Sequence, residues 1–244
     1  MRPKIYLFGD SITESSFAGG GWGASLTNHF SRRVDMVVRG FGGYNTRWAL
    51  KVIDKVFPPA PAADSGVGEA EAPLAVTVFF GANDASLPDR HAAFQHVPVD
   101  EYKQNLCSIV SLLKRRWPRT HVLLITPPPI HEAARLLYPY GENKLGLPER
   151  TNEAAGSYAK ACLSVAAEFQ APAIDLWTKM QQFPGWQTAL LWDGLHLTER
   201  GNRIVFEEVV EKLKGEGLSL ETLLADLPLI TDIDPNDPLK AFEI

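Results

Sequence analysis

Short apolar runs alternate with amphipathic stretches along most of the chain. Five apolar runs, most of them rich in β-branched residues, predict strands buried on both faces: 4–8, 34–38, 75–80, 121–126 and 172–176. Between and after them, apolar residues recur at helical spacing and predict helices over 22–32, 44–57, 98–116, 151–169 and 198–214. Alternation of this kind is typical of a doubly wound parallel sheet, so we expect a three-layer α/β/α sandwich with five strands.

Three segments interrupt this alternation. Residues 58–73 are rich in Pro, Ala, Gly and acidic residues, which predicts a mobile surface loop. Residues 127–150 begin with three prolines and continue with an apolar cluster at 136–140, so this segment is a candidate lid. Residues 225–244 form an acidic tail punctuated by prolines, which either packs across the domain or frays.

Composition excludes several classes of protein. Hydrophobic residues make up 45% and charged residues 22% of the 244 residues, as in ordinary soluble proteins. The motifs described below span nearly all of 1–244, which favours a single domain. The net charge of -5 argues against a nucleic acid partner. No apolar run approaches the roughly 20 residues of a membrane span. Since no signal peptide is visible and the two cysteines read as buried thiols, we expect a cytoplasmic location. The oligomeric state stays open.

Small and polar residues follow several predicted strands directly. Ser11 comes after the first strand, Gly43 after the second and Asn83 after the third. Because ligands of a doubly wound sheet collect outside the carboxyl ends of its strands, we expect these residues to share one edge. Near the end of the chain, Asp193 and His196 precede the last predicted helix.

These residue types match the needs of acyl transfer. A serine hydroxyl is a weak nucleophile until a base takes its proton, and histidine, whose ordinary pKa is near 6.5, is the natural base. Asp193 would orient the imidazole of His196, although Asp10 is an alternative for that role. Taken singly, Ser11 reads as a cap, Asp193 as a turn residue and His196 as a structural histidine. Their joint occurrence favours a catalytic triad, with Ser11 on a loop outside any helix, and with Asp10 and Asp84 holding the Ser11 and Asn83 loops through backbone N–H groups.

The order of these motifs resembles the SGNH subgroup of the GDSL esterase/lipase family, from about residue 4 to residue 210. The matching blocks are Gly9-Asp10-Ser11, Gly43, Gly81-x-Asn83-Asp84 and Asp193-x-x-His196, with Ile12 in place of the family's usual leucine. Further segments look like the isoamyl acetate-hydrolysing esterase branch: Gly20-Gly21-Trp22-Gly23, the stretch 39–47 and Pro127-Pro128-Pro129.

The resemblance implies a flavodoxin-like fold and a serine esterase that acts on short-chain, acetyl-type carboxylic esters through an acyl-enzyme on Ser11. It also implies an oxyanion hole made of the backbone N–H groups of Ser11 and Gly43 and the side-chain amide of Asn83. Glycine lets a substrate oxygen approach its N–H, and an asparagine amide donates without adding charge. No cofactor and no metal is expected. The glycines at 19–23 lack a phosphate-binding motif, and we expect them to let Trp22 pack beside the site.

The substrate is expected to be a small-molecule ester, and its identity stays open. Leu137 and Tyr140 are candidates for an apolar substrate-binding wall, with local packing or self-association as the alternative. The same groups would also serve a deacetylase of an acetylated sugar or metabolite, or a thioesterase. A non-catalytic binding protein on the same scaffold is the remaining alternative.

Overall fold

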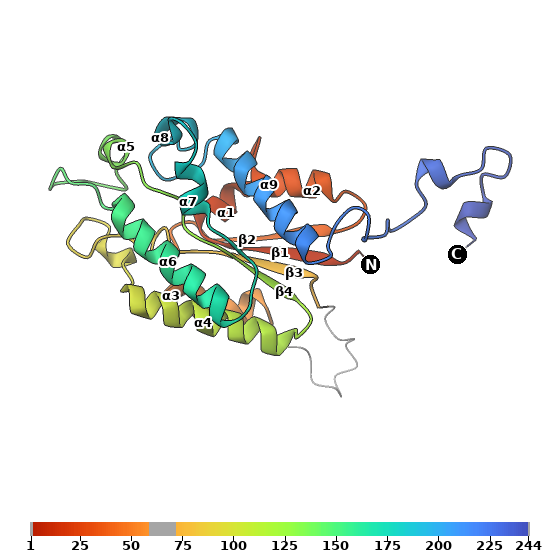
Figure 1. Cartoon of the computed structure of the whole chain (residues 1–244), viewed down its shortest axis with the longest axis horizontal. Coiled ribbons are helices and arrows are strands. Elements are labelled where there is room, and N and C mark those ends of the chain that lie inside the picture. Colours follow the sequence, from red (N-terminus) through yellow and green to blue (C-terminus); the bar gives the residue numbers. More distant parts are fainter. Residues whose placement is uncertain (1, 59–71, 244) are drawn as a thin grey trace.

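A five-stranded parallel sheet forms the middle layer of the protein (Figure 1). The computed structural model describes residues 2–58 and 72–243, so the loop expected at 58–73 lies almost wholly outside the described residues. The strands are β1 (Lys4–Gly9), β2 (Asp35–Gly40), β3 (Ala75–Phe79), β4 (His121–Ile125) and β5 (Ala173–Ile174). Their order is β2-β1-β3-β4-β5 and all neighbours are parallel, which confirms the expected flavodoxin-like sheet.

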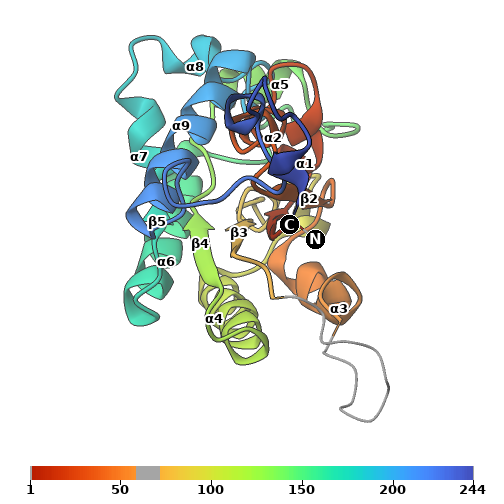
Figure 2. The same cartoon turned by 90° about the vertical axis from the view of Figure 1, so that its right-hand side faces the viewer.

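Helices cover both faces of this sheet, as Figure 2 shows. One face carries α2 (Trp22–His29) and α9 (Glu199–Gly215), and the other carries α3 (Thr46–Val56), α4 (Val99–Arg116) and α6 (Asn152–Glu168). Each face has its own apolar core, since the strands are buried on both sides. The first core includes Leu7, Trp22, Leu26, Val205 and Val209, and the second includes Phe8, Ile53, Leu106, Ile109 and Val165.

Ser11 does not lie on a loop, and that expectation was wrong. It is the first residue of a one-turn helix, α1 (Ser11–Glu14), which starts directly after β1. The reason is Asp10, whose side chain accepts a hydrogen bond from the N–H of Ile12 at 3.0 Å and so caps the turn. The cap leaves the Ser11 side chain at the very start of the turn, beside the carboxyl end of β1.

The expected strand at 172–176 is also shorter than predicted. Only Ala173–Ile174 pair with β4, because Asp175 accepts from the N–H of Thr178 at 3.0 Å and starts α7 (Leu176–Gln181). Two more short helices escaped the sequence patterns, α5 (Glu132–Leu137) and α8 (Trp186–Ala189), since one or two turns leave too few residues for a periodicity. Short 3₁₀ turns fall at Ser15–Phe17, Ala93–Gln95, Ile230–Asp232 and Lys240–Phe242.

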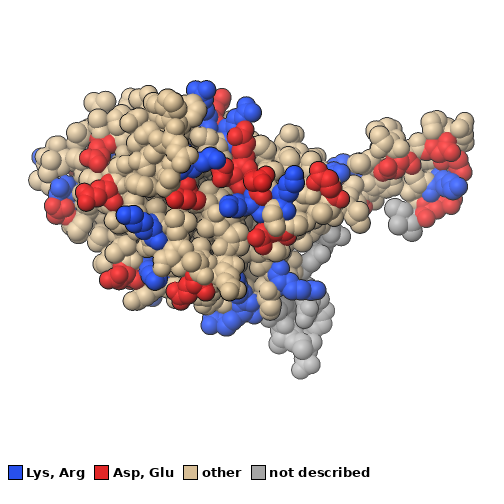
Figure 3. All heavy atoms as spheres, in the orientation of Figure 1, with Lys and Arg blue, Asp and Glu red and all other residues tan. Residues whose placement is uncertain are grey.

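The C-terminal segment projects away from the sandwich (Figure 1). The carboxylate of Asp226 anchors its base by pairing with Arg2 at 2.7 Å and with Arg32 at 3.2 Å. Beyond this anchor the large apolar side chains of Ile230, Leu239 and Phe242 are exposed. On the face seen in Figure 3, basic and acidic side chains are mixed rather than gathered by sign.

The two cysteines are free thiols, with Cys162 buried and Cys107 half-buried. Within residues 2–58 and 72–243, none of the helices has the length and apolar character that crossing a membrane requires.

Asp10 makes the stability of the protein depend on pH. Burial raises the pKa of its carboxyl to about 6, and its Oδ2 atom has no hydrogen-bond partner among the described residues. The folded protein therefore keeps a proton up to about pH 6 that the unfolded chain releases near the ordinary value of 3.8. Because the folded state binds more protons in this interval, the free energy of unfolding falls as the pH rises from about 4 to 6.

We expect Asp10→Asn to remove this dependence, because asparagine still accepts from the Ile12 N–H but does not ionise. Urea unfolding at pH 4 and pH 7 measures the effect. The variant should match the wild type near pH 4 and exceed it at pH 7 by at most roughly 3 kcal/mol. If the free energies of unfolding of the two proteins differed by the same amount at pH 4 and pH 7, Asp10 would not be the source of the pH dependence.

Candidate active site

The candidate site lies at the carboxyl edge of the sheet, where β1 and β3 run side by side. In this strand order β1 and β3 flank the point at which the order of the strands reverses, and ligands bind in the crevice that forms there. Ser11 follows β1, and Asn83 follows β3 by a few residues. Gly43 follows β2, the other neighbour of β1, so the three predicted residues share this edge.

Ser11, His196 and Asp193 form a continuous hydrogen-bonded row. The Ser11 Oγ atom lies 2.9 Å from His196 Nε2, and His196 Nδ1 lies 2.7 Å from Asp193 Oδ2. A carboxylate only accepts, so Nδ1 carries the hydrogen of this bond, and in the neutral ring Nε2 is then free to accept from the serine hydroxyl. This is the arrangement in which a histidine activates a serine.

A tight loop holds Asp193 and His196 on the same side. Leu191 and Leu197 form an antiparallel bridge, and the N–H of Trp192 donates to the carbonyl of His196 at 3.0 Å. Inside the loop, Asp193 Oδ1 accepts from the N–H of Leu195 at 2.9 Å and from that of His196 at 2.7 Å. The second carboxylate oxygen is thereby turned towards the imidazole.

Asp193 is ionised at neutral pH. Burial raises the pKa of its carboxyl, but the hydrogen bonds and charge of His196 outweigh burial and lower the pKa to about 2. Asp10, the alternative partner for His196, bonds to its own helix cap instead, and the imidazole pairs with Asp193.

The loop after β2 supplies a backbone N–H at Gly43. Its φ of +78° is a left-handed conformation that glycine adopts without strain, and a Cβ here would lie 3.3 Å from Gln95 Nε2. Asn83 lies against this loop, because its Nδ2 donates to the carbonyl of Tyr44 at 2.9 Å. One N–H of the amide is used in this bond, and the amide has a second.

Asp84 is structural and, as expected, fixes its loop by accepting from a backbone N–H group, which belongs to Thr46 at the start of α3. Its carboxylate accepts from the N–H of Thr46 at 3.0 Å and from the Thr46 hydroxyl, so it secures the start of α3. The first N–H groups of a helix have no partner within the helix, which explains why an acceptor is recruited from another segment. Burial raises the pKa of Asp84 to about 7.

Trp22 packs beside α1 as the glycines around it predict. Its side chain is fully buried, and its indole N–H donates to the carbonyl of Ile12 at 3.1 Å. A Cβ at Gly21 would lie 2.2 Å from the carbonyl oxygen of Ser16, so only glycine lets the chain pass there.

Leu137 and Tyr140, the predicted apolar wall, are exposed by 76% and 57%. A cavity of about 260 Å³ lies directly beside His196, and neither of them lines it. The segment 127–150 approaches this cavity through Tyr138, whose ring lies 6.3 Å from that of Trp192. Trp192 in turn stacks on the imidazole of His196 at a centroid distance of 5.9 Å. The cavity is lined by Ile12, Ser15, Trp192, His196, Leu197 and Asn202.

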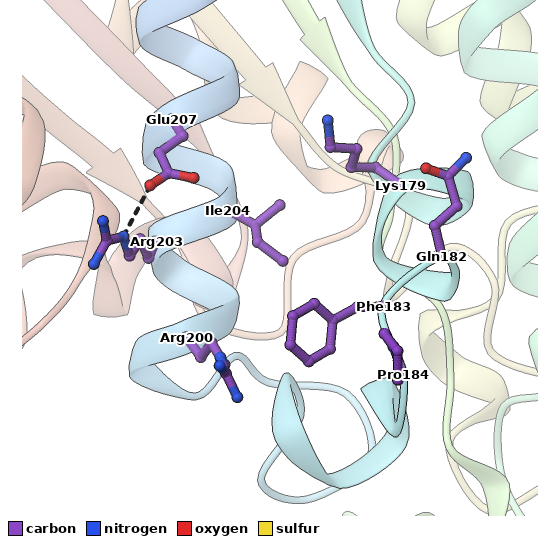
Figure 4. A pocket seen from close by; sticks show the side chains of 8 residues that line it. All are labelled: Lys179, Gln182, Phe183, Pro184, Arg200, Arg203, Ile204 and Glu207. Carbon is purple, nitrogen blue, oxygen red and sulfur yellow. Dashed lines mark hydrogen bonds and ion pairs between the residues drawn. The ribbon is translucent and has the colours of Figure 1, made fainter.

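A larger hollow of about 450 Å³ lies between α7 and α9 (Figure 4). In it, Phe183 and Arg200 face one another from the two sides, and the guanidinium carbon lies 4.7 Å from the centre of the ring. None of Ser11, Asp193 and His196 lines this hollow, so its residues are not part of the hydrogen-bonded row.

The sequence patterns missed the charged residues that surround the site. Arg135, Glu149 and Arg150 are buried against the loops of Asp193 and Asn83, and Gln95 joins them. All three charged residues fall in the segment 127–150, the candidate lid. The only local feature that could have pointed to them is that charged residues stand among apolar ones in this segment. That feature does not tell which of the charged side chains are buried.

Comparison with known proteins agrees with this geometry. The family model described as GDSL-like Lipase/Acylhydrolase matches residues 5–209. A GDSL esterase/lipase of Arabidopsis thaliana is 65% identical over 243 residues, which cover 100% of this chain and 99% of that protein. The isoamyl acetate-hydrolyzing esterase 1 homolog of Mus musculus is 41% identical over 243 residues, covering 98% and 91% of the two chains.

A solved structure extends the likeness to three dimensions. The lipase/acylhydrolase from Enterococcus faecalis superposes with a TM-score of 0.66 at 26% sequence identity, covering 93% of this chain and 100% of that one. Catalytic triads and oxyanion holes are features of this family, and the family model covers every residue of the candidate site from Ser11 to His196. The chain therefore belongs to the GDSL lipase/acylhydrolase family and is a carboxylic ester hydrolase.

Proposed function

We propose that this protein hydrolyses short-chain carboxylic esters, acetates among them, through an acyl-enzyme on Ser11. The observation that carries the proposal is the row from the Ser11 hydroxyl through the His196 imidazole to the Asp193 carboxylate, with spacings of 2.9 and 2.7 Å. Both spacings are within the reach that proton transfer and orientation require.

In the first half of the reaction, Ser11 Oγ attacks the carbonyl carbon of the ester while His196 Nε2 takes the hydroxyl proton. Asp193 stabilises the imidazolium that forms. The tetrahedral intermediate then breaks its bond to the alcohol oxygen, which leaves with the proton from Nε2. The acyl group is now bound to Ser11 as an ester.

In the second half, a water molecule attacks the acyl carbon and gives a proton to Nε2. The bond to Ser11 Oγ breaks, the serine recovers its proton from His196, and the carboxylic acid is released. In both halves the negative charge on the carbonyl oxygen needs preorganised donors. The backbone N–H groups of Ser11 and Gly43 and the free N–H of the Asn83 amide fill this role.

The proposed preference for short chains rests on the size of the cavity beside His196, which is lined by His196 but not by Ser11, Gly43 or Asn83. A volume of about 260 Å³, shared between apolar and polar lining residues, suits a small acyl or alcohol group. The name of the mouse relative refers to isoamyl acetate, an ester with a small acyl part and a five-carbon alcohol, which agrees with this size.

The first experiment compares the wild type with Ser11→Ala on p-nitrophenyl acetate. We expect kcat to fall by at least about 10³-fold, because the nucleophile is lost while binding and the oxyanion donors remain. Intact mass after treatment with a fluorophosphonate should show one adduct on the wild type, mapped to Ser11. A folded wild type with neither turnover nor adduct would reject the proposal in favour of a binding protein.

Trp192→Ala should relax the chain-length preference. Removing the indole opens the cavity beside His196, so kcat/KM for an octanoate ester relative to acetate is expected to rise by about tenfold. Leu239→Ala, in the projecting tail, is the control and should leave the ratio unchanged. A ratio in Trp192→Ala equal to that of the wild type would show that the cavity does not hold the substrate chain.

The apolar wall is a separate proposal with its own variants. If the segment 127–150 contacts the substrate chain, Leu137→Ala and Tyr140→Ala should each lower kcat/KM for octanoate several-fold more than for acetate, since each removes apolar contact with the longer chain. Both side chains are exposed, so the fold should not suffer. Identical ratios across acetate, butyrate and octanoate esters would assign these residues to another role.

A further inference from the structure

Three charged side chains are buried between the two halves of the candidate site. Arg135 comes from α5, and Glu149 and Arg150 follow at the far end of the segment 127–150. Their exposed fractions are 3%, 0% and 2%. Burying charges costs several kcal/mol for each ion unless partners compensate, so each of these groups needs a dense set of contacts.

Glu149 joins the two arginines. Its Oε1 atom accepts from Arg135 Nε at 2.7 Å and from Arg150 Nη1 at 2.8 Å. One oxygen thus ties α5, within the segment 127–150, to Arg150, the last residue of that segment. We call these three residues the buried ionic unit.

One end of the buried ionic unit holds the acid of the candidate triad. Arg135 Nη1 donates to Asp193 Oδ2 at 2.9 Å and to the backbone carbonyl of Asp193 at 3.0 Å. Asp193 Oδ2 is also the oxygen that accepts from His196. Arg135 therefore fixes both the side chain and the backbone of the residue that orients the imidazole.

The other end of the unit holds the Asn83 amide. Arg150 Nε donates to the carbonyl of Ala82 at 2.7 Å, and its Nη2 donates to Asn83 Oδ1 at 3.0 Å and to Gln95 Oε1 at 2.8 Å. Gln95 then donates through Nε2 to the carbonyl of Gly43 at 2.9 Å. The side chain of Arg150 thus contacts the loop of Asn83 directly and is linked to the loop of Gly43 through Gln95.

The contact of Arg150 with Asn83 favours the amide orientation in which Nδ2 donates to the carbonyl of Tyr44. An arginine has only donors, so the amide oxygen must turn towards Arg150 and the NH₂ group must turn away from it. A rotated amide would offer its oxygen to the oxyanion and repel it. The fork of the guanidinium also matches several acceptors at once, which a single ammonium group does not.

We propose that Arg150 is a positioning residue that sets the orientation of the Asn83 amide, and that Glu149 and Arg135 couple this orientation to Asp193. The base and the oxyanion donors are then held by one buried ionic unit instead of by independent loops. This inference rests on the proposed function, because it assigns Asn83 to the oxyanion.

A double-mutant cycle between Arg150→Lys and Asn83→Ala tests the proposal with p-nitrophenyl acetate. Alone, Arg150→Lys should lower kcat by about 10- to 100-fold with KM changed less than about twofold, because the loss is confined to the transition state. Asn83→Ala alone should lower kcat by about 10²- to 10³-fold. In the Asn83→Ala background, Arg150→Lys should change kcat less than about twofold, since there is no amide left to orient.

Two outcomes would overturn the inference. One is an unchanged kcat in Arg150→Lys, and the other is an equal loss in both backgrounds, which is what a purely structural role produces. The matched control is Arg116→Lys, which should keep wild-type kcat. Arg116 is a largely buried arginine at the end of α4 that pairs with Asp54. Each kcat is calculated per folded molecule, with the folded fraction of each variant measured by circular dichroism.

A second variant covers the case in which Arg150→Lys does not fold. Glu149→Gln keeps the size of the side chain and an acceptor for both arginines, but it weakens their hydrogen bonds because the charge is lost. It should lower kcat less than Arg150→Lys does, and this loss should again disappear in the Asn83→Ala background. The wild-type control separates the two proposals. Absent wild-type turnover rejects the proposed esterase activity, whereas normal turnover with a failed cycle rejects the positioning role alone.

Discussion

The site depends on one carboxylate, that of Asp193. Its two oxygens accept from the N–H groups of Leu195 and His196, from the His196 ring and from Arg135. The first two bonds shape the loop, the third orients the imidazole of His196, and the fourth links the loop to Arg135. A carboxylate with fewer donors would be costly to bury in ionised form. The contacts that fold the loop around Asp193 are therefore also the contacts that keep its carboxylate charged.

Parallel pairing explains why so much of the site follows from sequence. The ends of β1, β2 and β3 must meet at one edge, so a serine, a glycine and an asparagine placed directly after these strands are brought together by topology alone. The three longest helices, α4, α6 and α9, lie within about one residue of their expected bounds. In a long helix the apolar periodicity is carried by many side chains, so a single polar residue on the apolar face does not obscure it.

Short elements and buried charges escape this kind of reasoning. The one-turn helix at Ser11 exists because a single aspartate caps it, and β5 ends because Asp175 starts a helix. Nothing in the sequence indicates that Arg135, Glu149 and Arg150 are buried, because charged side chains are almost never fully buried unless paired. Their burial depends on partners that are far away in sequence, such as Asn83 and Asp193, and no local pattern contains that information.

The segment 127–150 joins two properties that usually belong to different parts of a protein. Arg135 and Arg150 anchor it to Asp193 and Asn83, whereas Leu137, Tyr140 and Leu145 between these two anchors are exposed. Substitutions in the exposed middle leave the two anchors in place, so they alter what the enzyme meets at its surface without moving the chemistry beneath. Such a layout separates the exposed residues of the segment from the contacts that hold Asp193 and Asn83.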